Sequence, residues 1–191
     1  MNKKKAWVLY AAVAVAAGLV VLMAWVNQDR LNPVVVGGPA PDFSTYDLQG
    51  VPYTLDDYRG KVVLLNIWAT WCTPCKEEMP SMQRLHEQIR DEDFQVLAVS
   101  IDRPPGDHDP QNPLDGKLRA FADSLGLTFT ILHDPSGEIS ETYQSTGVPE
   151  SFVLDREGII LKKISGPMAW DAPQNVQLIQ RLLDKETPPV Q

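Results

Sequence analysis

Two cysteines occur in the chain, Cys72 and Cys75, and two residues separate them. A CxxC pair can hold a zinc ion, form an inert disulfide or cycle between a dithiol and a disulfide. Zinc needs four ligands, and the three histidines stand singly at scattered positions, so zinc is the weakest alternative. A structural disulfide across so short a loop contributes little chain entropy to stability. The pattern therefore favours a redox-active dithiol.

The segments around this motif predict a strand followed by a helix. Residues 62–69 are apolar and rich in β-branched side chains, as in a buried strand. Met82, Leu85 and Ile89 recur at spacings of three and four, which predicts one apolar helical face. Cys72 would then lie at the helix N-terminus, where free backbone N–H groups and the helix dipole stabilise a thiolate.

The first residues have the pattern of a membrane anchor. Residues 1–5 contain three lysines and 6–26 contain no charge. At about 1.5 Å per residue, such a helix spans a hydrocarbon core of about 30 Å. We predict a cytoplasmic basic N-terminus at 1–5 and a single transmembrane helix at 6–26, with the rest of the chain exported. A cleaved signal peptide is the alternative, but the Ala-x-Ala combination at 14–16 lies inside the apolar run rather than after it.

The remaining chain predicts one α/β domain. Residues 27–38 end in two glycines, a proline follows them, and the segment predicts a linker. In 39–186, apolar strands alternate with amphipathic helices, which predicts a mixed central sheet flanked by helices. A weakly alternating stretch at 42–55 predicts a small β-hairpin ahead of the main fold. Residues 103–113 are rich in proline and aspartate, as in an exposed loop, and 187–191 form a tail.

The charge balance argues against nucleic-acid binding. The chain has 17 basic and 25 acidic residues, a formal net charge of −8. Three of the basic residues are the lysines at 3–5, so the predicted exported part is more acidic still. Such a surface repels a phosphate backbone, and no basic patch with interleaved aromatic residues occurs in the sequence.

Several motifs together resemble the thioredoxin fold. They are WCTPC opening a helix, GVPE at 147–150 introducing a late β-hairpin, and a closing helix, over roughly 39–185. The leading stretch at 40–43 resembles the membrane-anchored TlpA/ResA branch, which includes the cytochrome c maturation proteins called CcmG or DsbE. WCTPC together with GVPESFVLD is a specific combination, whereas APDF at 40–43 also occurs in peroxiredoxins.

The resemblance implies a catalytic role for three residues. Cys72 matches the attacking cysteine, and Cys75 matches the resolving one. Asn66 stands where thioredoxin carries a buried aspartate, and the ResA-type proteins supply another acid, which matches Glu78. A carboxylate there would relay protons between the sulfurs and water. The alternative for Glu78 is an ordinary first-turn helix residue that the dipole favours.

The resemblance also implies a substrate-binding surface, formed by Trp71, Thr73, Pro74, Val148, Pro149 and Glu150. Pro149 matches the proline that is cis in this fold and that leaves the Val148 backbone free to pair with a peptide. Trp71 would present an exposed ring, with core packing as the alternative. Glu150 would border the active-site surface, with a simple surface charge as the alternative.

The resemblance implies a thiol–disulfide oxidoreductase on the outer face of a bacterial cytoplasmic membrane. It would reduce disulfides of exported proteins such as apocytochrome c and take electrons from a DsbD- or CcdA-type membrane protein, with no cofactor beyond the cysteine pair. A general disulfide oxidant or isomerase and a tethered binding or chaperone module stay open as alternatives. A peroxiredoxin-like peroxidase is disfavoured because its Pro-x-x-x-Thr-x-x-Cys pattern is missing.

Overall fold

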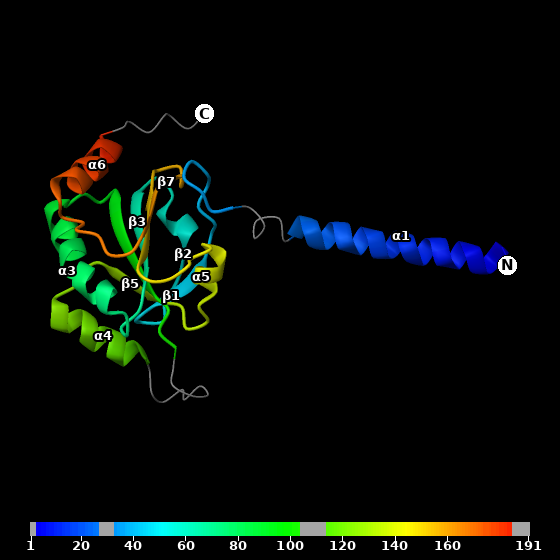
Figure 1. Ribbon diagram of the computed structural model, residues 1–191, viewed down its shortest axis with the longest axis horizontal. Coiled ribbons are helices and arrows are strands. Elements are labelled where there is room, and N and C mark those ends of the chain that lie inside the picture. Colours follow the sequence, from blue (N-terminus) through cyan, green and yellow to red (C-terminus); the bar gives the residue numbers. More distant parts are fainter. Residues whose placement is uncertain (1–2, 27–32, 104–113, 185–191) are drawn as a thin grey trace. The chain divides into compact units, whose positions relative to one another are not determined.

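The computed structural model describes residues 3–26, 33–103 and 114–184 (Figure 1). These residues form two compact units, one ending at Pro33 and one beginning at Val34, and each is described by itself. The predicted tail at 187–191, residues 27–32 of the predicted linker and residues 104–113 of the predicted loop lie outside the described residues.

The first unit consists of helix α1, Lys3–Val26. Its described side chains are exposed, with Trp7 at 76% and Val21 at 68% of full exposure. Among the residues that the structure describes, no helix is long and apolar enough to cross a membrane. The transmembrane helix predicted at 6–26 is therefore not confirmed.

The second unit is a sheet with helices on both faces. Its strands are β1 (Ser44–Asp47), β2 (Pro52–Thr54), β3 (Val62–Trp68), β4 (Phe94–Ser100), β5 (Thr130–His133), β6 (Glu150–Leu154) and β7 (Ile160–Ser165). Its helices are α3 (Thr73–Gln88), α4 (Leu114–Leu125), α5 (Glu138–Thr142), α6 (Pro173–Leu183) and the 3₁₀-helix η1 (Leu55–Tyr58). The strand order is β2-β1-β5-β4-β3-β6-β7. β4 pairs in parallel with β3 and β5, and the other pairs are antiparallel, so the predicted mixed sheet is confirmed.

β3 is the interior strand that precedes the CxxC motif, and all seven of its residues are buried. Leu64 and Trp68 face the core cluster beneath α3, α4 and α6, whereas Leu65 and Ile67 face the cluster beneath α5 and η1. Figure 1 shows the same layers, with α5 on one side of the sheet and the three longer helices on the other. Burial on both faces explains why the sequence of β3 is apolar without alternation.

The domain begins earlier than the sequence predicted. Val34 is buried, the Gly37 N–H donates to the Ile160 carbonyl over 2.8 Å, and the Ile160 N–H donates to the Gly38 carbonyl over 2.9 Å. Gly37 has a φ of +89°, a conformation that glycine adopts without strain. The glycines that indicated a linker therefore make a turn that joins this segment to the start of β7.

The segment before β3 forms one edge of the main sheet. β1 pairs antiparallel with β2, with Ser44 opposite Thr54, and also with β5, with Tyr46 opposite His133. This stretch, predicted as a separate small hairpin ahead of the fold, thus continues the sheet beyond β5.

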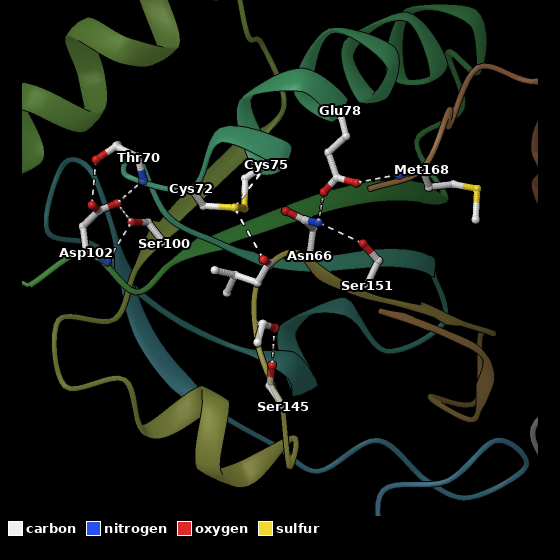
Figure 2. Close-up of a disulfide and its surroundings, with 12 residues drawn as sticks. Asn66, Thr70, Cys72, Cys75, Glu78, Ser100, Asp102, Ser145, Ser151 and Met168 are labelled. Carbon is white, nitrogen blue, oxygen red and sulfur yellow. Dashed lines mark hydrogen bonds between the residues drawn. A yellow bond between two sulfur atoms is a disulfide. The ribbon is translucent and has the colours of Figure 1, made fainter. Parts of the chain in front are cut away.

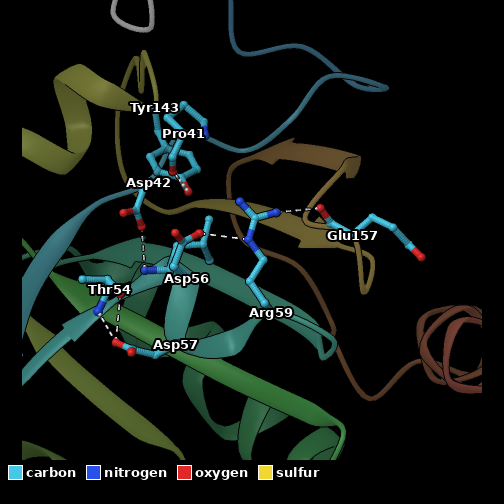
Figure 3. A network of polar contacts seen from close by, with 9 residues as sticks. Pro41, Asp42, Thr54, Asp56, Asp57, Arg59, Tyr143 and Glu157 are labelled. Carbon is cyan, nitrogen blue, oxygen red and sulfur yellow. Dashed lines mark hydrogen bonds and ion pairs between the residues drawn. The ribbon is translucent and has the colours of Figure 1, made fainter. Parts of the chain in front are cut away.

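Polar contacts hold the chain where it enters β3 (Figure 3). The Asp57 carboxylate accepts hydrogen bonds from the Thr54 N–H over 2.7 Å and from its hydroxyl over 2.9 Å, which caps η1. Arg59, directly after η1, donates to the Asp56 carboxylate over 2.9 Å and to the Glu157 carbonyl over 3.0 Å. The start of β3 is therefore fixed to the turn between β6 and β7.

Candidate active site

Cys72 and Cys75 form a disulfide where the chain leaves β3 and enters α3 (Figure 2). Cys72 is the N-cap residue of α3, and its Sγ accepts a hydrogen bond from the Cys75 N–H over 3.2 Å. The predicted placement at a helix N-terminus is thus confirmed. Cys72 is 5% exposed and Cys75 is fully buried. A thiolate that arrives from solvent can therefore reach Cys72 but not Cys75.

The loop before β6 lies against this disulfide. The Val148–Pro149 peptide bond is cis, as the resemblance implied. The Val148 carbonyl oxygen lies 3.5 Å from the Cys72 Sγ. Within the loop, the Ser145 hydroxyl donates to the Gly147 carbonyl over 2.8 Å. The backbone of this loop is thus the part of the fold that borders the accessible sulfur.

Exposed side chains surround Cys72 on its own segment. Trp71 is 66% exposed, so its ring does not pack in the core. Trp68 packs in the core instead. It is fully buried, and its ring centroid lies 5.2 Å from that of Phe121. Thr73 and Pro74 are also exposed. The disulfide therefore has an apolar ring beside it on the surface.

Glu78 is a buried carboxyl group on α3, one turn after Cys75, and only 2% of it is exposed. Its Oε1 accepts a hydrogen bond from the Asn66 Nδ2 over 2.7 Å, and its Oε2 accepts one from the Met168 N–H over 3.0 Å. Burial raises the pKa of Glu78 to about 7, although these hydrogen bonds act in the opposite direction. A carboxyl group with such a pKa can take up and release a proton near neutral pH.

Its burial also distinguishes Glu78 from the neighbouring Glu77. Glu77 is exposed, whereas Glu78 points into the protein. The alternative, a first-turn helix residue that the dipole favours, stays open, but the side chain of Glu78 faces the interior rather than solvent. Asn66 and Met168 each donate to one of its carboxylate oxygens, and the relay of protons between the sulfurs and water stays a prediction.

Asn66 connects three elements behind the disulfide. It lies in β3, it is fully buried, and its Nδ2 donates to Glu78 on α3 and to the Ser151 hydroxyl on β6 over 2.8 Å. The site thus has a buried polar layer below the exposed Trp71 and the half-buried Val148.

The structure corrects the prediction for Glu150, which is 1% exposed rather than part of the active-site surface. Its Oε1 accepts a hydrogen bond from the Ser165 hydroxyl over 2.7 Å and lies 3.7 Å from the Lys163 Nζ. The physical reason is that β6 lies between β3 and β7, so its first side chain is enclosed by residues of β7. Glu150 cannot contact a substrate in this arrangement.

A buried acid that the sequence analysis missed holds the loop before the CxxC motif. Asp102 is 4% exposed. Its carboxylate accepts hydrogen bonds from the Thr70 N–H over 2.8 Å, the Thr70 hydroxyl over 2.7 Å and the Ser100 hydroxyl over 2.6 Å. Because β3 and β4 are parallel, the residues after each strand meet at the same edge of the sheet. That relation is the signal from which Asp102 could have been found.

Metal-ligating side chains do not gather in the described parts of the chain: no three His, Cys, Asp or Glu residues lie close enough together to share an ion. Two of the histidines have other contacts. The His86 ring meets the Phe129 ring edge-on at 6.2 Å, and the His133 Nε2 lies 2.9 Å from the Asp102 carbonyl.

The chain matches proteins of known family over most of the second unit. The family model described as AhpC/TSA matches residues 36–163. The thiol-disulfide oxidoreductase ResA of Geobacillus thermodenitrificans is 36% identical over 148 residues, which are 77% of this chain and 79% of that protein.

Solved structures agree with this match. A crystal structure of a proposed thiol:disulfide interchange protein DsbE from Chlorobium tepidum has a TM-score of 0.63 at 29% identity and covers 78% of this chain and 96% of that one. A solution structure of a proposed protein disulfide isomerase from Bacteroides thetaiotaomicron has a TM-score of 0.68 at 31% identity. The match covers 80% of this chain and 92% of that one. These similarities confirm the predicted resemblance. The chain therefore belongs to the AhpC/TSA family, among the thioredoxin-fold thiol–disulfide oxidoreductases that are similar to ResA.

Proposed function

We propose that Cys72 is the attacking cysteine and Cys75 the resolving one. In the dithiol form, the Cys72 thiolate attacks a substrate disulfide, which breaks that S–S bond, forms a mixed disulfide and releases one substrate thiolate. Cys75 then attacks the Cys72 sulfur and releases the second substrate thiolate. The substrate gains two electrons, and the enzyme keeps the Cys72–Cys75 disulfide. The supporting observation is the difference in exposure, 5% for Cys72 and none for Cys75.

The substrate peptide is proposed to bind across the loop that borders Cys72. The Val148 carbonyl faces the sulfur, and Pro149 has no N–H of its own, so an extended peptide would pair with the Val148 backbone. The exposed ring of Trp71 would contact apolar side chains of that peptide, and Thr73 and Pro74 would complete the surface.

Glu78 is proposed to handle the proton of Cys75. Cys75 must lose its proton to attack the mixed disulfide, and this thiol is buried. A carboxylate one helical turn away, with a pKa of about 7, is suited to receive that proton. We propose no metal or organic cofactor for the reaction, because two sulfurs suffice for thiol–disulfide exchange.

The proposed substrates are disulfides of exported proteins, with apocytochrome c as the leading candidate and a DsbD- or CcdA-type membrane protein as the electron donor. Support comes from the similarity to proteins named ResA and DsbE and from the resemblance to the cytochrome c maturation branch. The test is reduction of a peptide that carries an oxidised CxxCH motif. A scrambled disulfide of unrelated sequence is the control, and equal rates on both would argue against this substrate.

We also propose that the N-terminal unit attaches the protein to a bacterial cytoplasmic membrane and leaves the domain outside the cytoplasm. The support is the uncharged run at 6–26 after three lysines, together with the exposed apolar side chains of α1. Membrane fractionation of the full chain, compared with a chain that begins at residue 27, tests this proposal. Recovery of both proteins in the same soluble fraction would contradict it.

A general disulfide oxidant or isomerase is the second candidate. The similarity to the proposed disulfide isomerase of Bacteroides thetaiotaomicron favours it. The reduction potential distinguishes an oxidant from a reductant, because the disulfide of an oxidant is reduced more easily and has the higher potential. A tethered binding or chaperone module is the third candidate, and it predicts that Cys72→Ser leaves the biological role unchanged.

The deciding experiment is the equilibrium reduction potential of the Cys72–Cys75 pair in the full chain, measured against dithiothreitol in detergent micelles. A value near that of thioredoxin, about −270 mV, supports a reductant. A value near about −120 mV, as in strong oxidants, contradicts the reductive direction and supports the second candidate.

A further inference from the structure

The side-chain amide of Asn66 has one polar atom that the disulfide form of the protein leaves without a partner. The two N–H bonds of its Nδ2 are used, by Glu78 Oε1 at 2.7 Å and by the Ser151 Oγ at 2.8 Å. When Glu78 is ionised it only accepts hydrogen bonds, so in that state these contacts fix which way the amide is turned. The Asn66 Oδ1 is buried and accepts no hydrogen bond from any residue that the structure describes. Buried acceptors of this kind are rare in native proteins.

The unpartnered Oδ1 lies on the same side of the sheet as the cysteine pair. Side chains alternate along a strand, so Asn66 projects from β3 in the same direction as Leu64 and Trp68. Those two residues share one core cluster with Cys72 and Cys75 beneath α3. Figure 2 shows the Oδ1 of Asn66 turned toward the disulfide and its Nδ2 turned toward the carboxylate of α3.

Reduction creates the donor that this acceptor lacks. In the disulfide, neither sulfur carries a hydrogen. An external dithiol that reduces the bond delivers two electrons and two protons and is itself oxidised, so each cysteine can become an S–H group. A thiol S–H is a hydrogen-bond donor. Cys75 is the fully buried cysteine, and it lies one helical turn before Glu78, the residue that holds the other side of the Asn66 amide.

We propose that Asn66 is a positioning residue of the dithiol state, in which its Oδ1 accepts a hydrogen bond from the Cys75 S–H while its Nδ2 holds the Glu78 carboxylate. One rigid amide then fixes the thiol and the carboxyl group between which the proton moves. This inference deepens the proposed function and rests on it. It also accounts for asparagine at this position. An aspartate would be a second carboxylate next to Glu78, and two adjacent carboxylates resist ionising together.

Infrared spectroscopy of a single-thiol variant tests this proposal on the full chain in detergent. Cys72→Ser leaves Cys75 as the one thiol, so its S–H stretching band is unambiguous. The expected band lies at the lower frequency of a hydrogen-bonded thiol and moves to higher frequency when Asn66→Ala is added. Ser151→Ala is the matched control. It removes the other partner of Nδ2 and leaves Oδ1 in place, so the band is expected to stay. An identical band with and without Asn66 overturns the proposal.

A second measurement leaves Asn66 in place, in case its removal prevents folding. The side-chain carbonyl carbon of Asn66 is compared by NMR between Cys72→Ser and the double variant Cys72→Ser, Cys75→Ala. Its resonance is expected to shift when the Cys75 thiol is lost. Asn175 is the internal reference, because its buried amide is bonded elsewhere, to the Ala169 carbonyl over 2.8 Å. No shift of Asn66 relative to Asn175 overturns the proposal.

The outcomes for this inference and for the proposed function are distinguishable. Reduction of a protein disulfide by the unsubstituted chain measures the function, and the thiol band measures the hydrogen bond. Activity without the band shift contradicts the role of Asn66 alone. The band shift without activity contradicts the proposed function alone.

Discussion

Asp102 holds Thr70 through two hydrogen bonds, one from its backbone N–H and one from its hydroxyl, and Thr70 stands two residues before Cys72. The carboxylate comes from the end of β4 and the threonine from the end of β3. The loop that presents the accessible sulfur is therefore fixed to the neighbouring strand, and its position does not depend on α3 alone.

Asp102→Asn tests this attachment with almost no change in shape. An asparagine would remove the negative charge that strengthens all three hydrogen bonds, and its N–H₂ could pair only with a hydroxyl group that turns to accept. We expect the free energy of unfolding to fall by about 1–3 kcal/mol in urea titrations. Disulfide reduction is expected to slow as well, because the CxxC loop loses its support.

Thr70→Val is the partner variant for a double-mutant cycle with Asp102→Asn. Valine keeps the shape of threonine and the backbone N–H but removes the hydroxyl. Because the two residues contact each other, their effects are expected to be non-additive by at least about 0.5 kcal/mol. Strict additivity would mean that the Thr70 hydroxyl and the Asp102 carboxylate are not coupled.

The raised pKa of Glu78 predicts that the folded protein becomes less stable as the pH rises. The unfolded chain releases this proton near pH 4.5, whereas the folded protein holds it until about pH 7. Between these values the folded state binds more protons, so stability falls with rising pH. The difference in pKa corresponds to about 3 kcal/mol. Urea titrations of the disulfide form at pH 5 and pH 8 measure this fall.

Two variants show whether the fall belongs to Glu78. Glu78→Gln removes the titrating group, so its stability should change less between the two pH values than that of the unsubstituted chain. Glu77→Gln alters the exposed neighbour and should keep the full fall. If both variants behave alike, the buried carboxyl group is not the source.

Cys75→Ser is expected to accumulate a mixed disulfide. The Cys72 thiolate still attacks a substrate disulfide, but nothing then displaces the bound chain, because the buried resolving sulfur is gone. Non-reducing gel electrophoresis with a disulfide-containing peptide should show one covalent adduct, which dithiothreitol removes. Cys72→Ser should give none. An adduct of equal yield on Cys72→Ser would reverse the assigned roles.

Trp71→Ala is expected to weaken substrate binding without unfolding the protein. The ring is 66% exposed, so its loss should change stability by no more than about 0.5 kcal/mol. For a peptide disulfide we expect KM to rise about tenfold, which corresponds to about 1.4 kcal/mol of lost contact. The rate with a small disulfide should stay constant. An equal loss on both substrates would point to a role in the chemistry.

Much of the fold and the centre of the site followed from the sequence. The apolar run of β3 and the regular spacing of Met82, Leu85 and Ile89 are local signals, and local signals predict strands and helices well. The CxxC motif between them placed the sulfurs at a helix N-terminus, where the structure has them. These features depend on neighbours in the chain, which a sequence displays directly.

The remaining parts depend on contacts between distant segments. Glu150 was predicted to border the active-site surface because nothing near it in the chain reveals Lys163 and Ser165 on the adjacent strand. Asp102 was not predicted because its partner, Thr70, is 32 positions away. Sheet pairing decides both cases, and pairing is a property of the whole domain.

The pairing of Gly37 and Gly38 with Ile160 determines where a mechanical load would enter the domain. Ile160 lies opposite Leu154, and Leu154 lies opposite Val63, near the start of β3. The disulfide follows the other end of that strand, about 20 Å away at about 3.3 Å per residue. A pull on the preceding chain would first load the contact between the Val34 N–H and the Gln144 side chain, and then this pairing at the end of the sheet remote from the cysteines.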